Sequence, residues 1–233
     1  MPLEKGEREL IAAGLKTLGI LRSGAGGLSD KKLDEFHDEK VDRFSLFLEE
    51  LLLWNRRTNL IGKATTREII IRHVFDSLSV YHLLKEKNAS ILDVGAGAGF
   101  PSVPLAIIDR ALRIAAVERR HKRAAFLQNI AVLLNLDHLE VIEADVRDIS
   151  GRFDIVLARG VGELAVLYEL TRKTVKEHAM IIAFKGRITE IEKEVSRLKE
   201  KTAGGKSLNL SIQRVRVPFL DEEERNIVII ETK

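Results

Sequence analysis

Three alternating glycines follow an apolar segment that contains an acid, and this arrangement suits the binding of a small charged molecule. The acid is Asp93, and the glycines are Gly95, Gly97 and Gly99. Because glycine has no Cβ, such a loop lets backbone amides approach a ligand closely. Pro101 suits the first turn of a helix, where an N–H group is not needed. The sequence therefore predicts a strand, a glycine loop and the start of a helix.

The spacing of these glycines distinguishes two kinds of cofactor. Dinucleotide-binding folds favour G-x-G-x-x-G, with the third glycine one position later than in this chain. The pattern D-x-G-x-G-x-G is instead typical of loops that hold S-adenosylmethionine, whose methionine end is a zwitterion. We expect Asp93 to orient water or amides around the ammonium group, while the helix N-terminus favours the carboxylate. By itself, the loop could equally be only a tight turn.

Two more acids end the next two predicted strands. Glu118 follows the apolar segment 112–117, about 20 residues beyond the glycine loop, where a carboxylate can accept both ribose hydroxyls. Asp145 follows the segment 139–143 and is expected near the adenine. Either acid could instead be a helix cap. The order of the loop and the two acids favours ligand binding.

Arg159 follows the predicted strand 153–158. In one interpretation its guanidinium binds the cofactor carboxylate or an RNA phosphate, where bidentate geometry strengthens the contact. In the other it pairs with a surface carboxylate, an interaction that contributes little to stability. We favour the first and expect Arg159 to be the residue closest to catalysis.

Basic residues are concentrated in two segments that could bind RNA. The first, at a predicted helix start where acids are normally favoured, contains Arg119, Arg120, His121, Lys122 and Arg123. The second contains Arg56, Arg57, Lys63, Arg67 and Arg72. An external polyanion would explain both segments. The alternative is a solvated charged face, which we favour for Arg67.

A few other side chains could contribute to a site. Trp54 and Phe100 could stack on bases, although Trp54 is better explained as a core anchor at a helix end and Phe100 as a neighbour of the adenosyl group. His73 and Asp76 are expected to fix a helical cap over the cofactor pocket, with an RNA contact possible. The histidines lack the spacing of metal ligands such as H-E-x-x-H, so we expect no metal.

Composition limits the class of protein. The 233 residues are 45% hydrophobic and 31% charged, with a formal net charge of +3 and no cysteine, which excludes disulfides and thiol catalysis. No apolar run approaches the roughly 18 residues that span a bilayer, and the polar N-terminus does not resemble a signal peptide. We expect a cytoplasmic protein with no membrane contact and no obligate protein partner.

The elements that would position these residues fall into two parts. Residues 1–88 show only helical periodicity, including an amphipathic helix with Ser29 as its N-cap, preceded by a glycine-rich turn at 23–27. Residues 89–233 alternate strands and helices, which indicates an α/β fold with a mostly parallel sheet. The predicted strands are 90–94, 112–117, 139–143, 153–158, 178–185, 208–217 and 226–231. A connection of only 218–225 makes the last two strands antiparallel.

Taken together, these motifs resemble the bacterial small-subunit ribosomal RNA methyltransferase G family, also called glucose-inhibited division protein B. The resemblance runs from about Phe44 to the C-terminus. It rests on the motifs Trp54-Asn55, Asn59-Leu60-Ile61, Arg72 to Leu78, Leu92 to Pro101, Pro104-Leu105-Ala106, Glu118, Lys122-Arg123, Phe126-Leu127, Ala158-Arg159 and Lys185-Gly186. It implies a Rossmann-like class I S-adenosylmethionine-dependent methyltransferase with a seven-stranded sheet and a helical N-terminal extension.

The resemblance also implies an activity and a set of contacts. The expected reaction is methyl transfer to N7 of one guanine in 16S ribosomal RNA, with the RNA or the small ribosomal subunit as partner. Cofactor contacts are implied for Gly95, Phe100, Glu118, Val146, Arg147 and Arg159. RNA contacts are expected for Arg56, Arg57, Arg72, Arg119, Arg120, Lys122, Arg123 and Lys185. The chain departs from the family at Ser102 and Arg119, where small residues are usual, and at Gly160 and Gly162, where alanines are usual.

The residue types also narrow the chemistry. Methylation at pyrimidine C5 generally needs a cysteine nucleophile, and methylation of exocyclic amines typically uses a Pro-Pro motif; this chain has neither. Guanine N7 exposes a lone pair and loses no proton, so positioning without a general base suffices. Ribose 2′-oxygen or another RNA position remains open. A nicotinamide-dependent oxidoreductase and a noncatalytic RNA-binding module are the two other classes that the sequence allows.

Overall fold

A computed structural model describes residues 2–21, 30–85, 88–202 and 208–232. The expected glycine-rich turn at 23–27 and the expected N-cap Ser29 lie outside the described residues. Seven strands form one sheet in the order β3-β2-β1-β4-β5-β7-β6. They are β1 (Ser90–Val94), β2 (Arg113–Val117), β3 (Leu139–Ile142), β4 (Phe153–Arg159), β5 (Val175–Lys185), β6 (Asn209–Arg214) and β7 (Asn226–Glu231).

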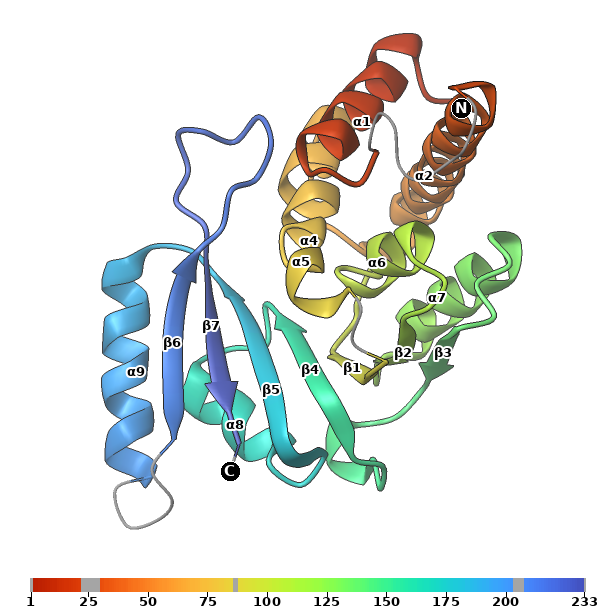
Figure 1. The fold of residues 1–233 in the computed structure, drawn as a ribbon. Helices are drawn as coiled ribbons and strands as arrows, with labels where there is room; N and C mark the ends of the chain where they lie inside the picture. The colour runs from red at the N-terminus through yellow and green to blue at the C-terminus, as the bar shows by residue number, and fades with distance from the viewer. Residues whose placement is uncertain (1, 22–29, 86–87, 203–207, 233) are drawn as a thin grey trace.

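Strand direction agrees with the prediction. β1 to β5 pair in parallel, and β7 is antiparallel to both of its neighbours, β5 and β6. The mostly parallel sheet with an antiparallel last strand is therefore confirmed. Because β7 lies between β5 and β6, the carboxyl ends of the other six strands share one edge of the sheet (Figure 1).

Helices cover both faces of this sheet, and most precede or separate the strands. The N-terminal extension contains α1 (Lys5–Thr17), α2 (Asp30–Thr58), α3 (Thr66–Ile69), the π-helix η1 (Ile70–Phe75), α4 (Asp76–Leu78) and α5 (Tyr81–Leu84). The remaining helices are α6 (Ser102–Ile108), α7 (His121–Leu133), the 3-10 turn η2 (Val146–Asp148), α8 (Leu164–Thr171) and α9 (Ile188–Thr202). Figure 1 shows α1 and α2 packed on the side of the molecule that also holds α6 and α7.

Two hydrophobic clusters, one on each face of the sheet, form the core. The larger joins side chains of the extension, such as Phe44, Phe47 and Phe75, to Ile91 and Phe126 in the sheet and α7. The smaller packs α8 and α9 against the opposite face. The extension therefore completes the core of the sheet rather than forming a core of its own. A domain boundary between residues 88 and 89 remains a prediction.

The long helix α2 shows why the extension docks as it does. Its residues Val41, Phe44, Leu48 and Leu51 recur at three- and four-residue spacing, and all four are buried. Across the described ranges, no helix has the length and apolar character needed to cross a membrane.

The structure corrects some element limits. α6 begins at Ser102, so Pro101 occupies the N-cap position and is not the first helical residue. β5 begins three residues earlier than expected, and β6 ends at Arg214 instead of residue 217. The residues that follow β6 pack Val215 and Val217 into the core, which explains why their apolar pattern predicts a longer strand.

Candidate cofactor site

The glycine loop adopts backbone conformations that favour glycine. Gly95, Gly97 and Gly99 have φ values of +68°, +58° and +89°. At Gly99 an added Cβ would lie 2.6 Å from the Val103 side chain, so the loop is also packed closely against α6. The amides of Gly95 and Ala96 donate to the Val117 carbonyl, which anchors the loop to the end of β2.

Glu118 is buried beside this loop, with 4% of its surface exposed. Its Oε2 accepts a hydrogen bond from the Gly97 amide at 3.1 Å, and its Oε1 accepts one from the Arg120 amide at 2.8 Å. Each oxygen therefore keeps acceptor capacity for a ligand hydroxyl. The sequence-predicted ribose acid and the glycine loop thus form one unit.

A cavity of about 480 Å³ lies at the carboxyl ends of the strands, as expected for ligands of such sheets. Gly95 and Glu118 line it, together with Asp145, Val146 and Arg147. Its volume falls in the range of about 300 to 1,000 Å³ that is usual for small-molecule sites. The structure therefore brings together the residues predicted from three separate strand ends.

Asp145 and Arg147 are linked within this cavity. The Arg147 guanidinium donates to both carboxylate oxygens of Asp145, from Nε at 2.9 Å and from a terminal nitrogen at 2.8 Å. Asp145 also accepts from the Arg147 amide as the N-cap of η2. These bonds hold the pKa of Asp145 well below its usual range. The carboxylate is therefore ionised and fixed in orientation.

Asp93 lies behind the glycine loop and does not line the cavity. It is 1% exposed; its Oδ2 accepts from the Ser102 amide at 3.2 Å. Neither its Oδ1 nor the Ser102 hydroxyl has a hydrogen-bond partner among the described residues. Burial raises the pKa of Asp93 to about 6. An unpaired buried carboxylate oxygen is costly, and a cationic ligand group near the loop would lower that cost.

Arg159 is held by three acceptors from the extension. It donates from Nε to Asp76 Oδ2 at 2.9 Å, and a terminal nitrogen lies 2.8 Å from the Arg72 carbonyl and 2.7 Å from His73 Nδ1. Neither sequence-based interpretation anticipated this arrangement, because the paired carboxylate is buried. The contacts are consistent with the expectation that His73 and Asp76 fix a helical cap.

His73 and Phe100 complete the surroundings of Arg159. The His73 ring stacks on Phe100 at 5.1 Å between centroids, and the Arg159 guanidinium carbon lies 5.8 Å from the Phe100 ring centroid. Burial, reinforced by the neighbouring arginines, lowers the pKa of His73 to about 4. The ring is therefore neutral near pH 7, and its Nδ1 can accept a hydrogen bond from the Arg159 guanidinium. Phe100 is buried and lines neither the cavity beside Glu118 nor the second cavity, which contains Arg159.

A second cavity of about 530 Å³ adjoins the first. The two share Gly160 and Val161, and the second is lined by Arg159, Lys185 and Arg225. Arg225 Nε lies 3.8 Å from Asp76 Oδ1, so one buried carboxylate faces two arginines. No sequence pattern indicates Arg225, because its partner Asp76 lies far away in the chain.

The predicted RNA-binding residues fall into separate groups. Arg119, Arg120 and Arg123 line the first cavity, and Lys122 is exposed on the same turn of α7. Arg56 and Arg57 are exposed at the end of α2. Arg72 pairs with Glu223, and Lys185 donates to Glu194 at 2.6 Å and to the Gly162 carbonyl. The last two cations therefore already have internal partners.

Ser102 is a site residue whose importance the sequence did not indicate. Its amide binds Asp93, and its hydroxyl is buried beside the unpaired carboxylate oxygen. The only signal was its departure from the glycine that is usual at this position. Trp54 packs edge-on against Phe126 at 5.6 Å, as expected of a core anchor.

The strand order, the single antiparallel strand and the cavity at the strand ends define the Rossmann-like fold of class I S-adenosylmethionine-dependent methyltransferases. Solved structures agree on the fold. An O-methyltransferase from Bacillus cereus in complex with SAH matches with a TM-score of 0.54 and 18% identity, covering 81% of this chain and 91% of its own. A SAM-dependent methyltransferase from Aquifex aeolicus matches with a TM-score of 0.53 and 18% identity, covering 71% and 93%.

Sequence comparison identifies the family. The model of the family rRNA small subunit methyltransferase G matches residues 40–228. A ribosomal RNA small subunit methyltransferase G of Acetivibrio thermocellus is 34% identical over 222 residues, covering 93% of this chain and 88% of the relative. That of Bacillus cereus is 35% identical over 202 residues, covering 83% of each. The chain belongs to the rRNA small subunit methyltransferase G family.

Proposed function

We propose that this protein transfers a methyl group from S-adenosylmethionine to N7 of one guanine in 16S ribosomal RNA. The observation that carries the proposal is the cavity at the strand ends, in which the glycine loop, Glu118 and Asp145 meet in a member of this family. The partner would be the RNA itself or the small ribosomal subunit. A cytoplasmic location follows from that partner.

The residues of the cavity fit the cofactor. The glycine loop would present amides to its methionine part, and Glu118 would accept its ribose hydroxyls with the acceptor capacity that Gly97 and Arg120 leave free. Asp93, whose Oδ1 has no partner within the described part of the chain, would favour the ammonium group from behind the loop. Asp145 and Val146 would border the adenine. When bound, the cofactor supplies an electrophilic methyl group on a sulfonium.

The protein's contribution is positioning. Guanine N7 attacks with its own lone pair, so no side chain has to remove a proton. Arg159, fixed by Asp76, His73 and the Arg72 carbonyl, is oriented before substrate arrives and can bind an anion at the junction of the two cavities. It should bind a carboxylate or a phosphate rather than N7, because the product ring becomes cationic.

The cations around the site would bind the phosphates of the RNA. Arg119, Arg120 and Arg123 line the cofactor cavity, so an RNA strand that delivers a base there would pass close to them. Lys122, Arg56 and Arg57 would extend this surface. Arg72 and Lys185 are the weakest members of the proposed set, because binding RNA would require each to leave an internal acid.

The test is methyl transfer from labelled S-adenosylmethionine to 16S rRNA and to small subunits that lack the modification. Chain cleavage specific for N7-methylguanine would map the product. We expect one cleavage site, which disappears with Gly97→Val, because a side chain at φ +58° would distort the loop. Methyl incorporation without cleavage would move the target to another atom, such as a ribose 2′-oxygen. Binding of NAD in preference to S-adenosylhomocysteine would overturn the proposal.

A further inference from the structure

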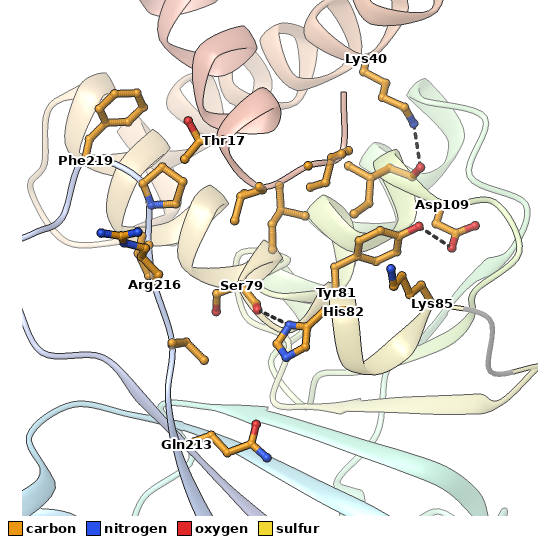
Figure 2. Close-up of a pocket in the computed structure, with 18 of the residues that line it drawn as sticks. Thr17, Lys40, Ser79, Tyr81, His82, Lys85, Asp109, Gln213, Arg216 and Phe219 are labelled. Atoms are coloured by element: carbon orange, nitrogen blue, oxygen red, sulfur yellow. Dashed lines mark hydrogen bonds between the residues drawn. The ribbon is translucent and has the colours of Figure 1, made fainter. Parts of the chain in front are cut away.

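A third cavity, of about 1140 Å³, lies between the extension and the segment that follows β6. Figure 2 shows its walls: Arg216 and Phe219 come from the segment between β6 and β7, and Tyr81, His82 and Lys85 come from α5 and its end. It shares no lining residue with the cofactor cavity. None of these residues belongs to the motifs that predict the cofactor site.

Three cations of this cavity have no acidic partner among the described residues. Lys85, Arg214 and Arg216 form no ion pair with any residue in the described part of the chain, whereas many other basic side chains of this protein do. Arg214 and Arg216 are exposed, and Lys85 is half-buried. Three positive charges around one cavity that form no ion pair within the described ranges favour an anion with several charges.

The cavity is lined by two acids, Asp109 and Asp221, which are fewer than its lysines and arginines. Asp109 accepts from the Tyr81 hydroxyl at 3.1 Å and from the Ala111 amide at 2.9 Å. Lys40, which also lines the cavity, donates to the Ile108 carbonyl at 2.7 Å and is buried. Asp221 is exposed on the segment before β7. The balance of formal charge among the lining residues is therefore positive.

Phe219 adds an exposed aromatic ring to the same wall. It is 44% exposed, although its ring also packs against Phe75, with 6.1 Å between the two ring centroids. Its φ of +64° is uncommon for a bulky residue. Uncommon backbone conformations of this kind cluster at active and ligand-binding sites.

We propose that this cavity binds an unpaired segment of the ribosomal RNA substrate, outside the target nucleotide. Cations that meet phosphates and aromatic rings that meet bases are the two components of single-stranded RNA sites. Lys85, Arg214 and Arg216 supply the first component, and Phe219 supplies the second. The identity of the RNA rests on the proposed function; the chemistry of the cavity does not.

The position of the cavity separates this contact from catalysis. The short helix α4 forms part of the wall between two cavities, because Asp76 lines the one that contains Arg159 and Leu78 lines this one. Changes to the cations of the third cavity should therefore weaken RNA binding and leave cofactor binding unchanged.

The first test neutralises the cations in one variant, Lys85→Gln/Arg214→Gln/Arg216→Gln. Binding of 16S rRNA is measured over a range of salt concentrations. We expect affinity at low salt to fall at least about tenfold, and the slope of log affinity against log salt to fall by about 2, or roughly 0.7 for each lost phosphate. The matched control is Lys173→Gln/Lys199→Gln/Lys201→Gln, which removes the same charge from exposed positions outside the cavity.

The second test removes the aromatic surface. Phe219→Leu keeps an apolar contact with Phe75 but has no π face, so we expect RNA affinity to fall by about fivefold or more with no change in salt slope. Phe219→Ala should weaken binding at least as much. Thermal unfolding of each variant shows whether the fold is retained.

The outcomes distinguish this inference from the proposed function. If the wild-type protein binds S-adenosylhomocysteine and methylates 16S rRNA, but the cavity variant and its control bind RNA equally, the inference is wrong and the proposed function stands. A small phosphorylated compound that binds in this cavity without weakening RNA binding would also overturn the inference. If the wild type does not methylate rRNA, the proposed function fails first.

Discussion

At the residue scale, the site depends on how each charge is held. Glu118 and Asp145 are fixed by backbone amides and by Arg147, and Arg159 is fixed by acceptors from another part of the chain. Asp93 differs, because one of its oxygens lacks a partner in the described structure. Its ionisation is therefore the one most sensitive to a bound ligand.

Asp93 should make both stability and cofactor affinity depend on pH. Its pKa is raised from 3.8 to about 6 in the folded protein, so between these values the folded state binds more protons than the unfolded state. The free energy of unfolding should therefore fall as pH rises from 4 to 6 and level off above, by roughly 3 kcal/mol from this group. Urea unfolding at several pH values, compared with Asp93→Asn, measures this difference.

The affinity for S-adenosylhomocysteine should change in the opposite direction. A ligand ammonium near Asp93 favours the ionised form, so affinity should weaken as pH falls below about 6. Calorimetric titration of the wild type and of Asp93→Asn tests this expectation. An identical pH dependence in both proteins would remove Asp93 from the cofactor contact.

Asp76 should control the activity of Arg159. Asp76→Asn replaces a buried charged acceptor with a neutral one, and hydrogen bonds to charged groups contribute about 1.5 to 3 kcal/mol. We expect methyl transfer to rRNA to slow about tenfold to a hundredfold, with the fold retained by circular dichroism. The control, Asp42→Asn, removes a carboxylate from an exposed pair with Arg8 and should leave the rate unchanged. Equal rates in the two variants would contradict the positioning role.

At the element scale, the segment η1–α4 connects the extension to the strand ends. It supplies the acceptors of Arg159, and its Phe75 packs beneath α1. An added Cβ at Gly14 of α1 would lie 2.1 Å from the Phe75 ring. The position of one helix thus constrains the element that holds the arginine.

Gly14→Ala should therefore destabilise the protein. Overpacking of this kind costs about 1 to 3 kcal/mol, and the displaced Phe75 adjoins Asp76. The control is Gly6→Ala in the same helix, where nothing lies within 4 Å, and where alanine should be neutral or slightly stabilising. Denaturant unfolding of both variants gives the comparison. A stable Gly14→Ala variant would show that α1 can shift.

The sequence predicted some of these elements and not others. Glu118 and Asp145 could be placed because the carboxyl ends of parallel strands meet at one edge, a rule that needs only local patterns. The acceptors of Arg159 could not, since side chains 83 to 87 residues apart leave no periodic signal. Lys185, predicted to bind RNA, pairs with Glu194 only nine residues away, across a turn between β5 and α9 that no periodic pattern describes.

At the scale of the whole molecule, the extension and the sheet share one hydrophobic cluster. Phe47 of α2 contacts Phe100 beside the glycine loop at 5.5 Å, and Trp54 contacts Phe126 of α7. Unfolding of the extension would expose the face of the sheet that it covers. The molecule should therefore unfold as one unit.

Trp54, the single tryptophan, reports on this directly. Its fluorescence and the far-ultraviolet circular dichroism should give coincident urea transitions, because both depend on the same core. S-adenosylhomocysteine should move both midpoints together. An earlier fluorescence transition would indicate that residues 1–88 unfold independently.

The place of β7 in the sheet has a consequence for the growing polypeptide. β6 leaves the translating ribosome before β7 but pairs only with β7, so it must wait without a hydrogen-bonding neighbour. Unpaired strands invite pairing with other chains. Its sequence Asn-Leu-Ser-Ile-Gln-Arg alternates polar with apolar side chains and ends in a charge, which limits such pairing during synthesis. When β7 emerges and pairs with β6, it therefore completes the sheet and ends the interval in which the nascent chain is most exposed to aggregation.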